Sequence, residues 1–201
     1  MNAERPFITV VSGIPRSGTS LMMQMLAAGG MPVLTDGVRN SDVNNPRGYY
    51  EWEPIKALRH RPEVIAAAEG KAVKVISSLL QALSRQYTYG VIFMCRPLEE
   101  IVTSQNKMLK RLGKDVPEPL AYTAITAFEQ HLEYTREWLS KQSNMVVLWM
   151  NYAAILEEPE LSSLTISGFL CKPLKINAMV QQVEQSLHRE RTSARLEFET
   201  S

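Results

Sequence analysis

The feature that most restricts the fold of this 201-residue chain is a hydrophobic strand that runs into a glycine-bearing loop and then into a helix. Residues 7–12 (FITVVS) form a β-branched run, which is typical of a strand buried on both faces. Residues 19–28 carry apolar side chains at three- and four-residue intervals, and this spacing predicts a helix that stops at the glycine pair 29–30. The intervening loop, residues 13–18, therefore joins the end of a buried strand to the start of a helix.

Strands and helices alternate through the rest of the chain. Apolar runs predict further strands at residues 72–76, 90–95 and 145–150. Helices are expected at residues 53–68, 78–86, 97–112 and 118–141, with shorter helices in the C-terminal third. Residues 35–50 are rich in Asp, Asn, Gly and Arg and predict a long polar loop, a kind of segment that is often functional. The alternation is typical of an α/β protein with a mostly parallel central sheet flanked by helices, here one domain over residues 1–201.

Composition excludes several functional classes. The net charge of +1, from 22 basic and 21 acidic side chains, gives no broad basic surface for nucleic acid. The longest apolar runs are far shorter than the roughly 20 residues of a membrane-spanning helix, and the N-terminus lacks the pattern of a signal peptide. Cys95 and Cys171 have no metal-ligand spacing and are too few for a disulfide framework. We therefore expect a cytoplasmic protein without membrane insertion, nucleic-acid partner or bound metal.

The loop after the first strand has the composition of an anion site. Its sequence from Gly13, GIPRSGTS, has the glycine spacing of a phosphate-binding loop, but Thr19 stands where nucleotide kinases and GTPases have a lysine. The backbone amides of residues 17–20, at a helix N-terminus, still favour a bound anion. Arg16 supplies a cation within the loop, and the missing lysine argues against hydrolysis of ATP or GTP. The alternative is a tight turn whose glycines only permit close packing.

The segment PRSGTS, directly after a predicted strand, resembles the 5′-phosphosulfate loop of the sulfotransferases that use 3′-phosphoadenosine-5′-phosphosulfate (PAPS). The arginine after its proline resembles the form of this loop in the tyrosylprotein and bacterial branches. The resemblance implies a P-loop fold in which Arg16 contacts the 5′-phosphosulfate and stabilises the bridging oxygen as it leaves. It also implies a set of loop residues that bind the donor: Pro15, Arg16, Ser17, Gly18, Thr19 and Ser20.

A second segment, CRPLEEIVTS, places Arg96 after a predicted strand and Ser104 eight residues later on the next helix. This spacing resembles the 3′-phosphate site of the same family, in which an arginine and a serine hold the phosphate that distinguishes PAPS from simpler nucleotides. A guanidinium offers a forked contact to phosphate, which agrees with that role. The alternative is an arginine that pairs with Glu99 or Glu100 and a serine that faces solvent.

Candidate acceptor-side residues come from the polar loop and from the next strand. The segment NPRGYYE, which ends at Glu51, resembles a stretch of bacterial sulfotransferase-like proteins that shapes the acceptor side. Asp36 lies near the position of a glutamate base in the tyrosylprotein branch, so either Asp36 or Glu51 is a candidate base. Lys74, inside an apolar strand, corresponds to a family lysine that approaches the sulfuryl group; the alternative is a lysine at a sheet edge pointing to water. Ile76 stands where the cytosolic small-molecule branch has its histidine base.

Together these residues predict a sulfotransferase that moves a sulfuryl group from PAPS to an acceptor hydroxyl or amine, without a metal. Two other functions remain open at this point: an ATP-dependent P-loop phosphotransferase, and a module that binds PAPS or another nucleotide without turnover. The identity of the acceptor does not follow from the sequence.

Overall fold

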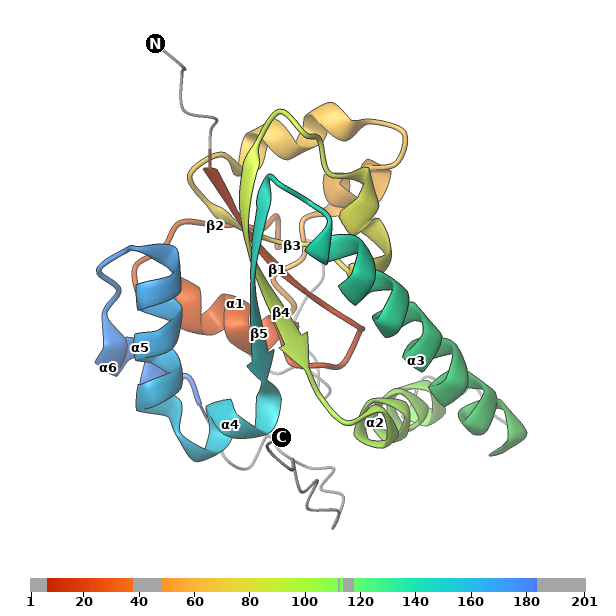
Figure 1. Cartoon of the computed structure of the whole chain (residues 1–201). Helices are drawn as coiled ribbons and strands as arrows, with labels where there is room; N and C mark the ends of the chain where they lie inside the picture. Colours follow the sequence, from red (N-terminus) through yellow and green to blue (C-terminus); the bar gives the residue numbers. More distant parts are fainter. Residues whose placement is uncertain (1–6, 38–47, 112, 114–117, 184–201) are drawn as a thin grey trace, which may run out of the picture.

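The structure, a computed structural model, describes residues 7–37, 48–111, 113 and 118–183. Its centre is a five-stranded sheet in the order β2-β3-β1-β4-β5, with every neighbouring pair parallel (Figure 1). The strands are β1 (Phe7–Gly13), β2 (Val33–Leu34), β3 (Ala72–Lys74), β4 (Thr88–Cys95) and β5 (Met145–Asn151). The predicted α/β fold with a parallel central sheet is confirmed.

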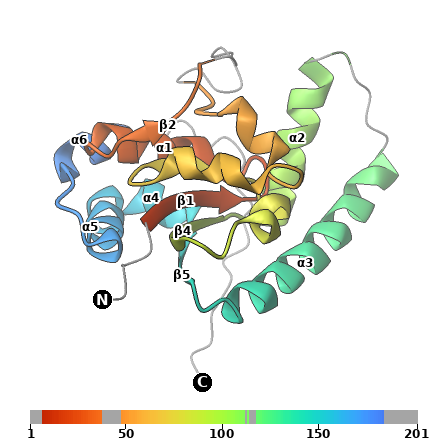
Figure 2. The ribbon, with the colours of Figure 1, turned by 90° about the horizontal axis from the view of Figure 1, so that it is seen from above.

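Helices cover both faces of the sheet. The α-helices are α1 (Thr19–Ala28), α2 (Leu98–Arg111), α3 (Glu118–Ser140), α4 (Tyr152–Glu157), α5 (Pro159–Leu170) and α6 (Ile176–Val180). Helices α1, α4, α5 and α6 pack on one face, whereas α2 and α3 lie on the side opposite to α5 and α6 (Figure 2). None of the helices in the described ranges is long and apolar enough to cross a membrane.

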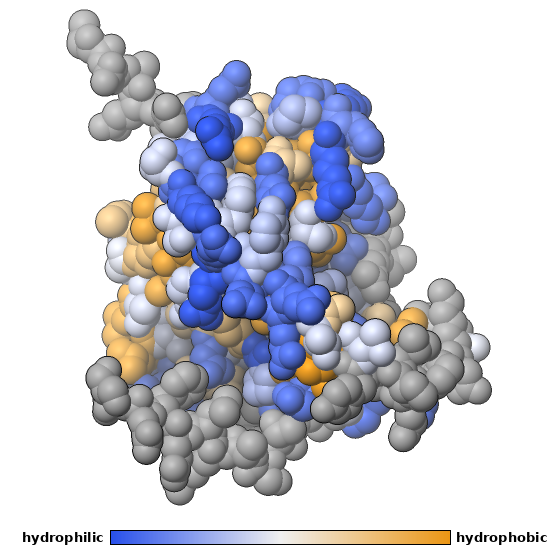
Figure 3. Space-filling model, turned by 45° about the vertical axis from the view of Figure 1, so that its right-hand side comes forward, coloured by the Kyte–Doolittle hydropathy of each residue, from blue (hydrophilic) through white to orange (hydrophobic). Residues whose placement is uncertain are grey.

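Two hydrophobic clusters, one on each face, fill the space between sheet and helices. Along β1, Val10 and Val11 point to opposite faces, as the two-residue period of a strand requires, and both are fully buried. Val11 packs with the methionines of α1, and Val10 packs with the short helices beside β3 and with Leu139 of α3. On the face drawn in Figure 3 the largest hydrophobic area lies at the left edge, smaller ones lie near the top and bottom, and hydrophilic residues run down the centre.

Two predicted helices are wrong in type and extent. Residues 53–68 form two short 3₁₀ helices, η1 (Glu53–Ala57) and η2 (Pro62–Ala68), and residues 78–86 give only η3 (Ser77–Ala82). Pro62 explains the first break, because a proline disfavours the helical conformation of the residue before it, and Arg61 has φ −136° and ψ 69°. The short strand β2 was not predicted, since its two residues carry no periodic signal.

Candidate functional site

The loop between β1 and α1 has glycines at positions that no other residue fits. Gly13 has φ 148°, and a Cβ there would lie 2.4 Å from Ser17 Oγ. Gly18 has φ 104°, and a Cβ there would lie 2.4 Å from Cδ2 of Tyr152. Close packing, the alternative stated from the sequence, is therefore one role of these glycines. Because Gly18 is the N-cap residue of α1, the first turn of this helix has no side-chain cap. That turn lies at the carboxyl end of the central strand.

Arg16 lies at the tip of this loop in a strained conformation. Its φ of 80° lies in the left-handed region, which costs a non-glycine residue about 1 to 2 kcal/mol. Helix α2 holds the loop in place, because Arg16 Nε donates to Ser104 Oγ at 3.1 Å and Gln105 Nε2 donates to the carbonyl of Pro15 at 3.2 Å. The structure thus brings Arg16 and Ser104 together, although the sequence assigned them to two separate phosphate contacts.

Arg96 follows β4 and is held by three neighbours. Its Nε donates to Glu100 Oε2 at 2.9 Å, and its Nη1 donates to the carbonyl of Arg16 at 3.2 Å. Its guanidinium carbon lies 4.8 Å from the ring centre of Tyr152. The pairing with Glu100, which was the alternative interpretation of the sequence, is therefore present. The second Nη of Arg96 has no hydrogen-bond partner within the described part of the chain.

Lys74 points into the site rather than to water. Its side chain is only 9% exposed, and its Nζ donates to Ser20 Oγ at 3.2 Å and to the carbonyl of Tyr49. Glu51 Oε1 lies 3.8 Å from the same Nζ. The direction follows from the strand period, because Lys74 shares a face of β3 with Ala72, which packs on the α1 side. A strand lysine thus adds a second cation to the site, beside Arg16.

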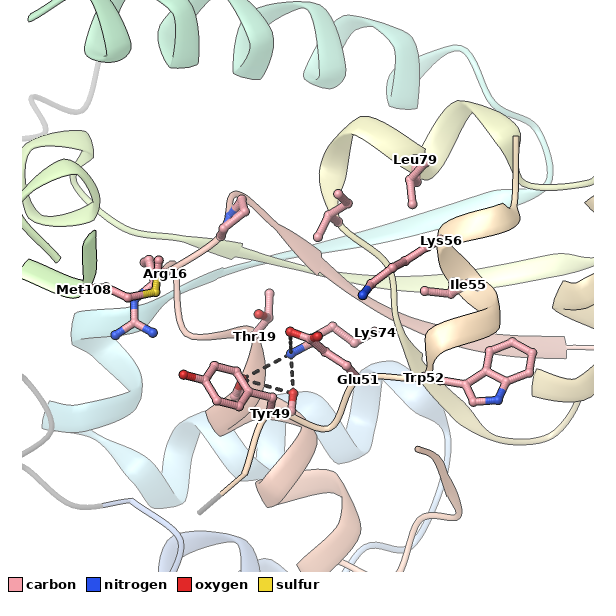
Figure 4. Close-up of a pocket in the computed structure, with 13 residues that line it drawn as sticks. Arg16, Thr19, Tyr49, Glu51, Trp52, Ile55, Lys56, Lys74, Leu79 and Met108 are labelled. Atoms are coloured by element: carbon pink, nitrogen blue, oxygen red, sulfur yellow. Dashed lines mark hydrogen bonds and ion pairs between the residues drawn. The ribbon is translucent and has the colours of Figure 1, made fainter. Parts of the chain in front are cut away.

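These groups surround one cavity of about 320 Å³ at the carboxyl end of β1 (Figure 4). Arg16 and Met108 lie on one side of it, Ile55 and Leu79 lie on the other, and Lys74 lies between them. The described residues that line the cavity are Pro15, Arg16, Thr19, Ser20, Tyr49, Glu51, Trp52, Ile55, Lys56, Lys74, Ile76, Leu79 and Met108.

The two candidate bases differ in their surroundings. Glu51 lines the cavity and is the one carboxylate among its described lining residues. Asp36 does not line it: its Oδ2 accepts a 2.5 Å hydrogen bond from the backbone N–H of Glu53, at the start of η1. Its own N–H donates to the carbonyl of Glu51 at 3.2 Å, so Asp36 helps to hold the segment that carries Glu51. Residues 45–47 of the NPRGYYE segment lie outside the described residues.

The cavity also contains the position at which the cytosolic small-molecule branch of sulfotransferases has its histidine. Ile76 lines it, and no histidine is found among its described lining residues. His131, on α3, lies elsewhere: its Nε2 is 2.8 Å from Ser77 Oγ, and burial lowers its pKa from 6.5. His188 lies outside the described residues.

A second cavity of about 140 Å³ lies beside Arg96, lined by both arginines of this region, Arg96 and Arg136. Arg136 stacks over the ring of Trp149 at 4.6 Å, and Cys95 lies next to it. Burial raises the pKa of the Cys95 thiol, which keeps this cysteine protonated.

Sequence reasoning missed two contributors to the site: Gln105 and the backbone carbonyl of Tyr49. Gln105 donates to a carbonyl of the loop, and its position in the sequence carries no signal for that contact. The four-residue spacing of Arg96 and Glu100, in contrast, is the signal on which the alternative interpretation of their pairing depended.

Three solved structures share the fold of this protein over most of the chain. The sulfotransferase domain from the Synechococcus PCC 7002 olefin synthase aligns with a TM-score of 0.58 at 15% identity, covering 94% of this chain and 82% of that one. The chain has the sulfotransferase fold. The sulfotransferase domain from the curacin biosynthetic pathway gives 0.52 at 15% identity, with 90% and 79% covered. Sulfotransferase STF9 from Mycobacterium avium gives 0.56 at 12% identity, with 96% and 70% covered.

No protein-family model matches the sequence, and no curated protein matches it either. The likeness of the sulfotransferase fold is therefore visible in the backbone and not in overall sequence. The resemblance of the PRSGTS loop to sulfotransferases agrees with the fold of these neighbours.

Proposed function

We propose that this protein transfers a sulfuryl group from PAPS to an acceptor hydroxyl or amine. One observation carries the proposal: Arg16, Ser20, Lys74 and Glu51 surround a single cavity at the carboxyl end of the central strand. Two cations, a hydroxyl and a carboxylate are the groups that transfer of an anionic sulfuryl group to a protic acceptor requires.

The loop residues suit the phosphosulfate end of the donor. Amides at the start of α1 and the dipole of that helix favour an anion, and Arg16 adds a full positive charge. Ser17 supports the fit, because its Oγ is buried and has no hydrogen-bond partner among the described residues. In the proposal Pro15, Gly18 and Thr19 complete the cradle around this end of the donor, as the resemblance implies.

The reaction in this proposal is an in-line displacement at sulfur. The acceptor oxygen or nitrogen forms a bond to sulfur while the bond from sulfur to the 5′-phosphate oxygen breaks, and that oxygen keeps the electron pair. Arg16 neutralises the charge that builds on the leaving oxygen, and Lys74 faces the sulfuryl oxygens. Glu51 takes the acceptor proton. The ion pair of Lys74 with Glu51, 3.8 Å apart, keeps the base beside the sulfuryl group.

The 3′-phosphate is assigned in this proposal to the second Nη of Arg96 and to Ser104. Arg96→Ala should then weaken binding of 3′-phosphorylated adenosine nucleotides by roughly ten- to a hundredfold, since a charged hydrogen bond contributes about 1.5 to 3 kcal/mol. Adenosine 5′-phosphosulfate, which lacks that phosphate, should bind nearly as before. Calorimetry with both ligands tests the assignment, and an equal loss for both would mean that Arg96 only supports the carbonyl of Arg16.

The test of the function itself compares PAPS, its desulfated product and ATP as ligands of the purified protein. Tighter binding of the two 3′-phosphorylated nucleotides is expected, because Thr19 in place of lysine leaves the ATP γ-phosphate without its usual cation. Single-turnover loss of labelled sulfate from PAPS then separates an enzyme from a binding module. Preferred binding of ATP, or tight binding of PAPS without transfer to any acceptor, would contradict the proposed function.

A further inference from the structure

The cavity has a second wall that sulfuryl transfer does not use. Three aliphatic side chains from three parts of the chain form it: Ile55 of η1, Ile76 after β3 and Leu79 of η3. Trp52 also lines the cavity. Figure 4 shows Ile55 and Leu79 on the side of Lys74 that lies away from Arg16. The cavity is therefore charged at the loop and apolar at its other end.

The charged groups near the apolar end are paired within the protein. Lys56 forms a 2.6 Å ion pair with Glu53. Ile76, in contrast, is a large apolar side chain that is 42% exposed beside the cavity. An acceptor with many hydroxyl groups would lose water at this wall without gaining hydrogen bonds, which is unfavourable for each group. An apolar body would instead cover Ile76 and its neighbours.

The size of the cavity limits the acceptor. Its volume is about 320 Å³. An apolar cavity of about 150 Å³ holds one benzene ring, so this cavity has room for about two rings, part of that space going to the sulfuryl group. One ring or two fused rings fit this limit. A folded polypeptide segment or an oligosaccharide would extend beyond the described walls.

We infer that the acceptor is a small, uncharged alcohol or phenol with an apolar body of one or two rings. This inference rests on the proposed function and names its substrate class. The hydroxyl lies between Glu51 and Lys74, and the body lies against Ile55, Ile76 and Leu79. The hydroxyl proton passes to Glu51 as the oxygen bonds to sulfur and the phosphate oxygen leaves with its electron pair.

The experiment compares 2-naphthol with glucosamine, a polar molecule of similar size that offers both hydroxyls and an amine. Calorimetry without donor should show binding of 2-naphthol with a negative heat-capacity change, the mark of apolar burial, and no comparable binding of glucosamine. With labelled PAPS, 2-naphthol should accept sulfate with a kcat/KM at least tenfold above that of glucosamine.

Ile76→Gln tests the wall directly, because the partly exposed position tolerates a polar side chain. It should raise the Kd and the KM for 2-naphthol about three- to tenfold and leave the affinity for PAPS unchanged. The matched control is Leu161→Gln on α5, where the leucine is 59% exposed and lies outside the cavity lining. The control should leave both ligands unaffected.

The outcomes separate the acceptor class from the proposed function. Sulfate transfer to glucosamine with none to 2-naphthol would overturn the inference and leave the proposed function standing. Equal loss of 2-naphthol binding in both glutamine variants, or no binding of 2-naphthol at all, would also overturn it. Binding of 2-naphthol that Ile76→Gln weakens, without transfer from PAPS to any acceptor, would support the apolar site and contradict the proposed function.

Discussion

Arg96 and Glu100 form a buried ion pair one helical turn apart, with Nε 2.9 Å from Oε2 and side chains only 7% and 6% exposed. The same guanidinium donates to the carbonyl of Arg16, whose own side chain reaches Ser104. A chain of polar contacts thus runs from the first turn of α2 to the tip of the loop after β1. We expect the conformation of Arg16 to depend on this chain.

Glu100→Ala should strongly destabilise the fold. Removing one partner of a buried ion pair leaves an uncompensated charge, and the cost is typically about 3 to 5 kcal/mol. Glu137→Ala is the matched control, because Glu137 and Lys141 form an exposed pair with the same spacing, with side chains 64% and 66% exposed. Solvent screens that pair, so the control should melt close to the parent protein. Urea unfolding of the three proteins measures the difference, and equal stability of both variants would contradict the prediction.

Arg16→Ala and Arg16→Gly should both lose turnover, by about a hundred- to a thousandfold in kcat, because a contact to the leaving oxygen counts mainly in the transition state. Their stabilities should differ. Glycine accepts the φ of 80° without strain, so Arg16→Gly should be more stable than Arg16→Ala by about 1 kcal/mol. Single-turnover kinetics and thermal melting measure the two effects. Parent-like kcat in either variant would remove Arg16 from the chemistry.

Gly18→Ala should distort the loop, because the new Cβ would lie 2.4 Å from Tyr152 at a φ of 104°. The control is Gly70→Ala, at a φ of 71° with no atom within 4 Å of its Cβ, where only the backbone strain of about 1 to 2 kcal/mol applies. We expect Gly18→Ala to lose more stability than the control and to bind PAPS at least tenfold more weakly. If calorimetry and melting gave the same values for both variants, contact with Tyr152 would not matter.

His131 should make stability depend on pH. Burial lowers its pKa in the folded protein below 6.5, so the unfolded chain binds the proton first as the pH falls. The stabilising effect of the neutral imidazole is complete above about pH 6.5 and is lost progressively as the pH falls toward the folded-state pKa. Denaturant midpoints between about pH 7 and about pH 5 should fall less in His131→Gln than in the parent. The exposed His60 gives the control, since His60→Gln should retain the full decrease.

The strand, loop and helix at the N-terminus could be predicted from the sequence because their signals are local. A β-branched run, two glycines and a helical period lie within one short stretch, residues 7–28, and each fixes the backbone through its own sterics. The helix predicted at residues 53–68 failed for a local reason too, since Pro62 disfavours a helical Arg61 and so prevents one continuous helix.

The arrangement of the site needed the tertiary structure. The sequence left two directions open for Lys74, and the pairing of β3 beside β1 turned it toward Ser20. It left two carboxylates as candidate bases, and the hydrogen bond of Asp36 to the backbone of Glu53 placed Glu51 at the cavity. Propensity and spacing describe a residue and its neighbours along the chain, whereas these choices depend on packing between segments far apart in sequence. The sequence alone determined that a glycine-bearing loop joins the central strand to a helix, and only the tertiary structure decided which side chains meet there.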